Sequence, residues 1–211
     1  MKIKLLFSPP NVLIKLIQLR WRGMLYEEGW FEAACYYKSV NRNLEPIPWW
    51  SYSFNDFFIP RIKEDIEIFE WGCGSSTIFL SKRVKNIVSI EHDKRYFEKI
   101  KKEVGSNVEL KFIELEYGEE YSRAILNEKK KFDLVIVDGR DRVNCVKNGI
   151  LGLKDDGVLI LDDSQRQNYK EAKEFMVENG FKYIDFTGVS AGTYKKKATT
   201  IFYKENNWVG I

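Results

Sequence analysis

The sequence has few of the residues that build metal sites, disulfides and membrane spans. Its 211 residues include one histidine and three cysteines, and no apolar run approaches the roughly 20 residues of a transmembrane helix. Cys35, Cys73 and Cys145 are odd in number and lack paired metal-ligand spacing, so we expect a reduced, cytoplasmic setting and no metal site. The apolar part of Met1–Pro10 is too short for a good secretion signal.

A large excess of either charge is also missing. Lys and Arg number 34 against 31 Asp and Glu, for a net charge of +3, which is too small to indicate a nucleic-acid partner by itself. With 44% hydrophobic and 31% charged residues, the composition is that of an ordinary folded protein. The length suits one α/β domain with an appendage.

Residues 1–62 are rich in aromatic side chains and lack alternating strand patterns, so we predict a helical extension there. Apolar residues recur at helical spacing over Asn11–Tyr26. Three basic residues lie between them: Lys15, Arg20 and Arg22. Such a helix can rest on a membrane surface, here the inner one, but packing on its own domain or on a second subunit is favoured. The prolines of Pro46–Tyr52 predict an extended connector that carries large rings into the body.

Residues 63–211 alternate between apolar runs and amphipathic helical patterns, which predicts an α/β domain. The predicted strands are Ile66–Glu70, Asn86–Glu91, Val108–Leu115, Phe132–Asp138, Gly157–Asp162, Phe181–Thr187 and Thr199–Tyr203. The clearest helices are Lys94–Val104 and Tyr169–Asn179. Near-continuous apolar strands joined by helices indicate a parallel sheet covered on both faces. We therefore predict a Rossmann-like, doubly wound, mostly parallel seven-stranded sheet that an antiparallel C-terminal hairpin closes.

The turn after the first strand lacks the third glycine of a dinucleotide motif. In Glu70-Trp71-Gly72-Cys73-Gly74, two glycines allow a ligand to lie against the backbone. Thr77 stands where the third glycine would be, and Glu70 would repel a pyrophosphate. An oxidoreductase with a nicotinamide cofactor is therefore disfavoured. A cofactor with a sulfonium, an amino group and no phosphate fits better, and Glu91 at the end of the second strand is placed to bind its ribose diol.

These residues resemble the first motif of the class I S-adenosylmethionine-dependent methyltransferases, which is an acid, a variable residue and Gly-x-Gly. The resemblance runs from about Ile66 to Lys204. It implies S-adenosylmethionine as the cofactor and a set of residues that bind it: Glu70, Gly72, Gly74, Ser76, Thr77, Glu91, Glu114 and Asp138. Glu70 would reach the amino group directly or through water, and Asp138 would lie below the methyl-donor end.

A finer resemblance is to bacterial methyltransferases linked to surface-polysaccharide and other glycan pathways. It is carried by Pro48-Trp49, Gly74-Ser75-Ser76-Thr77, Val137-Asp138-Gly139-Arg140-Asp141-Arg142 and Asp162-Asp163-Ser164-Gln165-Arg166. It implies a small-molecule or glycan acceptor that is methylated on a sugar hydroxyl. Trp49 could stack on such a sugar, although an aromatic core position is the commoner role of such a ring.

The chemistry at the acceptor depends on the acids that follow the fourth and fifth strands. Asp138-Gly139-Arg140 departs from the Asn/Asp-Pro-Pro-aromatic motif of many amino-methylating enzymes, which favours oxygen as the acceptor atom. A hydroxyl needs a base to take its proton, and Asp138 and Asp163 are the catalytic candidates, with Asp141 a further choice. The only histidine, His92, follows the cofactor-side acid and is expected to be a bystander.

Several alternatives remain open. Asp138, Asp162 and Asp163 could hold a divalent cation, as in some small-molecule O-methyltransferases, but ion pairs with nearby arginines are preferred. The arginines Arg140, Arg142 and Arg166 could instead bind an anionic acceptor. Since no histidine or lysine base is evident, a non-catalytic cofactor-binding protein is the second hypothesis. We expect Lys195-Lys196-Lys197 to form a solvated loop tip.

Overall fold

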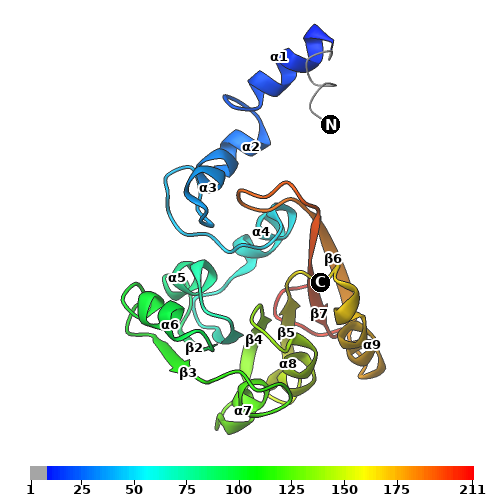
Figure 1. The fold of residues 1–211 in the computed structure, drawn as a ribbon. Coiled ribbons are helices and arrows are strands. Elements are labelled where there is room, and N and C mark those ends of the chain that lie inside the picture. Colours follow the sequence, from blue (N-terminus) through cyan, green and yellow to red (C-terminus); the bar gives the residue numbers. More distant parts are fainter. Residues whose placement is uncertain (1–8) are drawn as a thin grey trace.

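Seven strands form a single sheet at the centre of the protein (Figure 1). The computed structural model describes residues 9–211; the predictions for residues 1–8 therefore lie outside it. The strands are β1 (Glu67–Trp71), β2 (Asn86–Glu91), β3 (Val108–Phe112), β4 (Phe132–Val137), β5 (Leu153–Leu161), β6 (Lys182–Gly188) and β7 (Lys197–Tyr203). Their order is β3-β2-β1-β4-β5-β7-β6. The pairings among β1 to β5 are parallel and both pairings of β7 are antiparallel. This confirms the predicted fold class.

Helices precede the sheet and connect its strands. The α-helices are α1 (Pro10–Gln18), α2 (Met24–Glu27), α3 (Trp30–Tyr36), α4 (Tyr52–Phe58), α5 (Ser75–Ser81), α6 (Lys94–Ile100), α7 (Glu120–Arg123), α8 (Arg142–Gly149) and α9 (Lys170–Glu178). Short 3₁₀ turns cover Ile59–Arg61, Ala124–Asn127 and Gln167–Tyr169. None of the described helices is long and apolar enough to cross a membrane.

Each face of the sheet packs against helices. Because successive side chains of a strand point to opposite sides, neighbouring residues of one strand belong to different cores. Ile68 of β1 belongs to a core that also holds buried residues of α4 and α5, and its neighbour Phe69 belongs to a second core with α7, α8 and α9. Both side chains are fully buried. The central strands β1 and β4 are therefore buried on both sides, as the sequence predicts.

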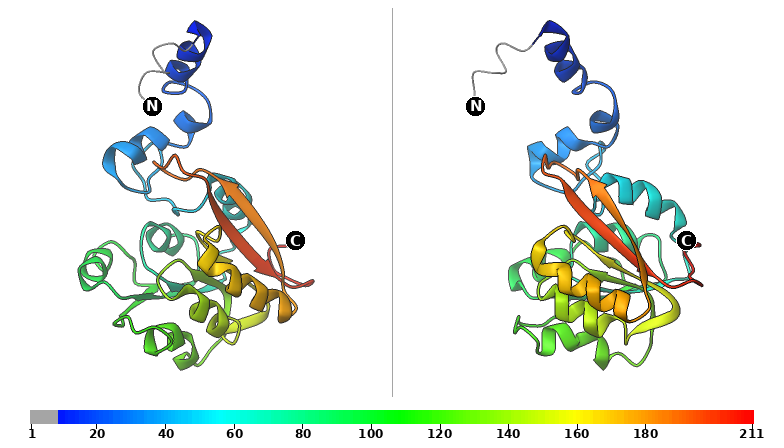
Figure 2. Two further views of the ribbon diagram at one scale, coloured as in Figure 1. Left: turned by 45° about the vertical axis from the view of Figure 1, so that its right-hand side comes forward. Right: turned by 90° about the vertical axis from the view of Figure 1, so that its right-hand side faces the viewer.

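The region before β1 divides into two unlike parts. Trp50 and Tyr52 of the predicted connector are fully buried in a core of the sheet, as are Phe54 and Phe58 of α4. This confirms that the connector carries large rings into the body. By contrast, α1 has no buried residue, and it lies well away from the sheet in all three ribbon views (Figures 1 and 2). The domain boundary between residues 62 and 63 stays a prediction. Aromatic side chains on the N-terminal side of that boundary belong to the same core as the strands.

Some element ends differ from the predicted ones. The single predicted helix over residues 11–26 is broken after α1, and Gly23 has a positive φ of 87° where α2 begins. β5 starts at Leu153, several residues earlier than predicted, and β3 ends at Phe112 rather than at residue 115. Asp155 and Asp156 in the first half of β5 are exposed, so this part of the strand lacks the apolar run by which a buried strand is recognised.

Candidate functional site

Two adjoining cavities lie at the edge of the sheet where the parallel strands end. The first has a volume of about 470 Å³ and is lined by residues that follow β1, β2 and β4. The second has a volume of about 710 Å³ and lies between the end of β5 and the β6–β7 loop (189–196). Three residues line both cavities: Trp49, Asp138 and Arg166. In open α/β sheets this edge is where ligands bind.

The turn after β1 brings the backbone ends of β1 and β4 into direct contact. Gly72 has φ of 91°, and a Cβ there would lie 2.7 Å from the Cα of Gly139. A Cβ at Gly139 would in turn overlap the hydroxyl of Tyr121, 2.0 Å away. Gly74 has an extended φ, and a Cβ on it would lie 3.2 Å from the Tyr96 hydroxyl. Glycine is therefore required at Gly72 and Gly139 by close approach, and both line the first cavity.

Glu70 is fully buried at the end of β1. Its carboxylate accepts hydrogen bonds from Ser76 Oγ and Thr77 Oγ1, both at 2.5 Å, and from Ser89 Oγ at 2.9 Å. Burial raises the pKa of this carboxyl group, whereas the three hydroxyl donors lower it; burial has the larger effect. Thr77 Oγ1 also accepts from the amide of Gly74 at 2.8 Å. Glu70 thus holds the glycine turn against the start of α5 from behind the cavity wall.

Glu91 is held rigidly at the end of β2, on the wall of the first cavity. Its Oε1 accepts from the backbone amides of His92 and Asp93, each at 2.8 Å, and its Oε2 lies 3.5 Å from the thiol of Cys73. Only 4% of the residue is exposed. His92 lines the same cavity, with Nδ1 2.9 Å from Glu91 Oε1. This carboxylate is oriented before any ligand arrives, and a diol is a fitting partner for it.

Three carboxylates and three basic side chains lie together where β4 and β5 end. The carboxylates are those of Asp138, Asp162 and Asp163, and the basic side chains are those of Arg142, Arg166 and Lys197. Arg142 lies 2.9 Å from Asp138 Oδ1, and Asp163 pairs with Arg166. Arg142 also donates to three backbone carbonyls, those of Asp138, Gly139 and Asp162. Its guanidinium is 7% exposed, so its hydrogen-bonding groups are already largely satisfied within the protein.

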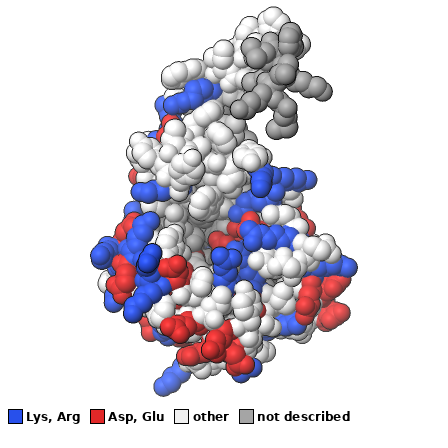
Figure 3. Space-filling view, viewed as in Figure 1, with Lys and Arg blue, Asp and Glu red and all other residues white. Residues whose placement is uncertain are grey.

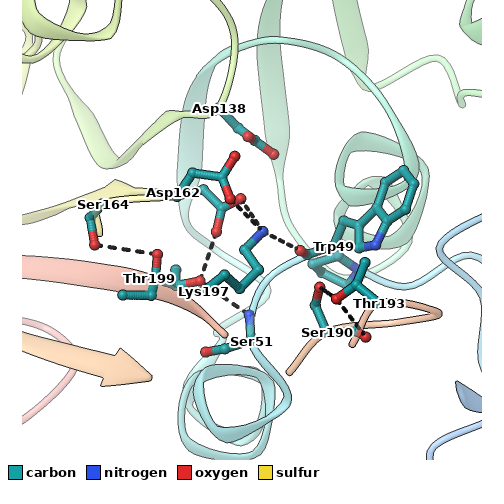
Figure 4. A network of polar contacts seen from close by, with 12 residues as sticks. Trp49, Ser51, Asp138, Asp162, Ser164, Ser190, Thr193, Lys197 and Thr199 are labelled. Carbon is teal, nitrogen blue, oxygen red and sulfur yellow. Dashed lines mark hydrogen bonds and ion pairs between the residues drawn. The ribbon is translucent and has the colours of Figure 1, made fainter. Parts of the chain in front are cut away.

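The third basic group is Lys197, where the structure corrects a prediction. We expected the whole of Lys195-Lys196-Lys197 to be a solvated tip, but Lys197 begins β7 and its side chain is only 12% exposed. Its Nζ lies 2.6 Å from Asp162 Oδ2, 3.4 Å from Asp163 Oδ1 and 2.8 Å from the carbonyl oxygen of Trp49 (Figure 4). Asp162 Oδ1 accepts from Thr199 Oγ1 at 2.7 Å. Only Lys195 and Lys196 of the run are exposed.

The two catalytic candidates differ in their electrostatic surroundings. Burial, and then the nearby Asp162, raise the pKa of Asp138 to about 7 although Arg142 and Lys197 oppose the shift. Burial also favours the neutral form of Asp163, but Lys197, Arg142 and Arg166 together outweigh it and lower the pKa of that carboxyl group. Asp138 is therefore the better proton acceptor near neutral pH.

The second cavity has a cationic and aromatic rim. The indole of Trp49 donates from Nε1 to the carbonyl oxygen of Ala191 at 2.8 Å, which ties the connector to the β6–β7 loop. Tyr194, Lys195 and Lys196 are exposed residues of that loop and line the cavity. Figure 3 shows Lys and Arg side chains gathered beside the central hollow of the molecule.

The structure brings most of the predicted site residues together, at differing depths. The following line the first cavity: Gly72, Gly74, Ser76, Glu91, Asp138, Trp49, Arg140, Arg142 and Arg166. Asp163 lines the second. Glu70 and Thr77 lie behind the wall, fully buried. Glu114 is exposed and lines neither cavity, so a role for it in binding stays a prediction.

Two site residues were missed from the sequence. Tyr96 of α6 lines the first cavity beside Gly74; its helix was predicted, but a tyrosine within it carried no signal of a ligand. Lys197 was hidden within a run of three lysines. Among the described residues, no group of three or more His, Cys, Asp or Glu side chains is placed to hold a metal ion.

Comparisons with known proteins add a likeness of fold. No protein-family model matches the chain, and no curated protein matches its sequence. The structure of cofactor-bound Rv0187 from MTB superposes with a TM-score of 0.60 at 16% identity, covering 95% of this chain and all (100%) of that one. Precorrin-6y C5,15-methyltransferase from Geobacter metallireducens GS-15 gives 0.52 at 20% identity, covering 69% of this chain and 85% of that one.

A third structure with this fold is described as a precorrin 8w decarboxylase, from Methanobacterium thermoautotrophicum. Its TM-score is 0.55 at 17% identity, and the match covers 79% of this chain and 96% of that one. These identities show a shared fold, and the names of these proteins cover more than one reaction. The chemistry of this chain has to be argued from its own site.

Proposed function

We propose that this protein transfers the methyl group of S-adenosylmethionine to a hydroxyl group of a small-molecule or glycan acceptor, in the cytoplasm. The observation that carries the proposal is that Asp138, at the end of β4, lines both cavities. One cavity has the features of a nucleoside site and the other has an open, polar rim. A reaction that joins two ligands needs their reacting ends to meet, and Asp138 marks the place where the two spaces adjoin.

The first cavity fits S-adenosylmethionine on two counts. Gly72 and Gly74 contribute no side chains to its wall. Glu91 presents a fixed carboxylate for the ribose hydroxyls. When bound, S-adenosylmethionine supplies an electrophilic methyl group on a sulfonium. The shared fold with a methyltransferase, and with a protein solved with its cofactor, supports the same choice.

The structure favours an indirect role for Glu70. Because its carboxyl group is fully buried and accepts three hydroxyl hydrogen bonds, we propose that it fixes the glycine turn from behind the cavity wall and does not touch the ligand. This refines the direct contact that the resemblance implies.

On the acceptor side, Asp138 is proposed as the base that takes the hydroxyl proton. Arg142 holds it in place through the ion pair and the carbonyl bonds around it. Asp163 is proposed as a positioning residue because its charge is already balanced by Arg166 and Lys197. Trp49 offers a partly exposed ring for a sugar face, and Arg166 with Lys195 and Lys196 offers charge for an anionic acceptor.

Titration calorimetry with S-adenosylhomocysteine tests the cofactor half of the proposal. Binding is expected for the wild-type chain, and Glu91→Gln should weaken it by about tenfold or more, since it removes a charged acceptor from the ribose site. Glu98→Gln makes the same change on an exposed residue of α6 outside both cavities and should leave the affinity unchanged. If the wild type fails to bind high-micromolar ligand, the proposal is wrong.

A screen of sugars and glycans, with homocysteine release after coupled hydrolysis as the readout, tests the catalytic half. Turnover that Asp138→Asn abolishes would reject the non-catalytic hypothesis. Turnover that a chelator abolishes would instead favour the metal-dependent alternative.

A further inference from the structure

The helix α1 and the turn after it present apolar side chains to solvent. None of the nine residues of α1 is buried. Ile17 is 65% exposed and Trp21, just beyond the helix, is 67% exposed. The other exposed apolar residues of this segment are Val12, Leu13, Ile14, Leu16, Leu19 and Met24. Figure 2 shows α1 away from the sheet in both of its views. A patch of this kind on a folded chain marks an interaction surface.

The apolar side chains of α1 are segregated from the polar ones. Asn11, Lys15 and Gln18 are spaced four and three residues apart, which places them along one side of a helix with about 3.6 residues per turn. The rest of the circumference is Val, Leu or Ile after the initial proline. This narrow polar side and broad apolar side are the pattern of a helix that lies in the plane of a membrane interface. Trp21 supplies the ring that such interfaces favour.

The charge of this segment has one sign. Residues 1–26 contain five Lys or Arg residues and no Asp or Glu; the first acid is Glu27. Lys15 is exposed, as is Arg22 in the turn after the helix. The rest of the chain carries nearly balanced charge, since the net value for all 211 residues is only +3. Figure 3 shows a mostly uncharged surface over the N-terminal helices and mixed charge over the body.

We propose that α1 and the turn that follows it bind the surface of an anionic lipid bilayer. Anionic headgroups complement the run of cations, and the acyl boundary accepts the broad apolar side. A second copy of this chain fits less well because its α1 segment has the same excess of positive charge, and joining the two apolar faces would bring like charges together. The proposal concerns a surface outside both cavities and does not rest on the proposed methyl transfer.

Bilayer contact would also orient the site. The N-terminal helices are tied to the β6–β7 loop, since Trp30 Nε1 donates to the carbonyl oxygen of Thr193 at 2.8 Å and Gly192 packs on the backbone of Ala33. The exposed Lys195 and Lys196 of that loop belong to the rim of the second cavity. The rim of the second cavity is therefore fixed to α3, which follows the proposed membrane-binding segment in the chain, and the loop carries two further exposed cations.

Flotation of the full chain with lipid vesicles tests the proposal. We expect binding to phosphatidylcholine vesicles that contain about one-third phosphatidylglycerol, and little binding to phosphatidylcholine alone. Asn11→Glu, on the polar side, adds one negative charge and should weaken binding by about fivefold. Ile17→Glu adds the same charge on the apolar side and should weaken it by about tenfold more. The double variant Lys15→Gln/Arg22→Gln should weaken it by about 30-fold.

Three outcomes would overturn the proposal: no binding to the anionic vesicles, equal effects of Asn11→Glu and Ile17→Glu, or a lipid-free dimer that Ile17→Glu dissociates in sedimentation velocity. The last would identify a second copy as the occupant. Affinity for S-adenosylhomocysteine should be the same in Ile17→Glu and wild type, because Ile17 lies outside both cavities. That measurement keeps a failure of this proposal separate from a failure of the proposed function.

Discussion

Asp138 and Asp163 belong to one cluster of charged side chains, but they differ in how readily they accept a proton. Partial burial and the nearby Asp162 raise the pKa of Asp138 to about 7, whereas three basic groups hold the pKa of Asp163 low. The difference comes from neighbours that three separate segments of the chain contribute: residues 138–142, residues 162–166 and Lys197 of β7. At the residue scale, then, chemical role depends on surroundings that are assembled only by folding.

The pH dependence of kcat/KM is the prediction that follows for Asp138. Only the deprotonated carboxylate accepts a proton, and its folded-state pKa is raised, so activity should be low in acid and rise with pH. We expect kcat/KM to increase by up to about tenfold per pH unit below pH 7 and then to level off. Initial rates across the pH range check this. Asp163→Asn should keep the inflection near 7 even if the rate falls; an unchanged profile in Asp138→Asn would contradict the assignment.

The sequence alone was enough to locate the acidic residues at the ends of strands. It was not enough to identify the residues, distant in the sequence, that form ion pairs with them. Glu91 and Asp138 were predicted correctly as residues of the sheet edge because an apolar run followed by an acid is a local pattern. Lys197 was misread because its contact with Asp162 spans 35 residues and depends on the register of the C-terminal hairpin. No local pattern distinguishes it from Lys195 and Lys196.

At the scale of elements, the site depends on how closely β1 and β4 approach beyond their last paired residues. Trp71 pairs with Val137 at the end of the ladder, and each strand then continues into a loop that contains a glycine. Gly72 and Gly139 touch there through backbone atoms. The floor of the first cavity is therefore main chain, which is stiffer than a floor of side chains.

Gly72→Ala should destabilise the fold by about 3 kcal/mol or more, because strain at positive φ adds to the clash of a Cβ that would lie only 2.7 Å from the Cα of Gly139. Gly180→Ala is the matched control. Its φ of 81° is also left-handed, but a Cβ there meets nothing within 4 Å, so it should lose only about 1 kcal/mol. Urea unfolding measures both. Equal losses in the free energy of unfolding of the two variants would show that the close approach of Gly72 to Gly139 does not affect stability.

The elements themselves were largely predictable, and their ends were less so. Apolar runs identified the central strands because strands that are covered on both faces need them. The edge strands β3 and β6 mix apolar with polar residues instead. The N-terminal helix was predicted too long, since apolar periodicity continues past Gln18 while the chain turns before Gly23. Periodicity reports which side chains are apolar; it does not report where backbone hydrogen bonding stops.

At the scale of the whole molecule, the N-terminal region combines a buried part with an exposed one. Phe54 is fully buried and stacks on Phe58, with ring centroids 5.1 Å apart. It also meets Phe186 of β6 edge-on at 5.3 Å. The sheet therefore depends for one of its two cores on a segment that precedes its first strand.

Phe54→Ala should lower the free energy of unfolding by about 3–5 kcal/mol, as expected for a large ring removed from a packed core. Trp21→Ala, which removes a larger ring that is 67% exposed, should change it by less than about 0.5 kcal/mol. Chemical denaturation of both variants tests the division of the N-terminal region. A small effect of Phe54→Ala would show that the core closes without this segment.

The wall shared by the two cavities has a thermodynamic consequence. Trp49 and Arg166 border both spaces, and the indole and carbonyl of Trp49 are bonded to Ala191 and Lys197. Any displacement of these side chains by one ligand alters the space that is left for the other. The two binding equilibria are then linked, and linkage is reciprocal: whatever factor the first ligand applies to the affinity of the second, the second applies to the first.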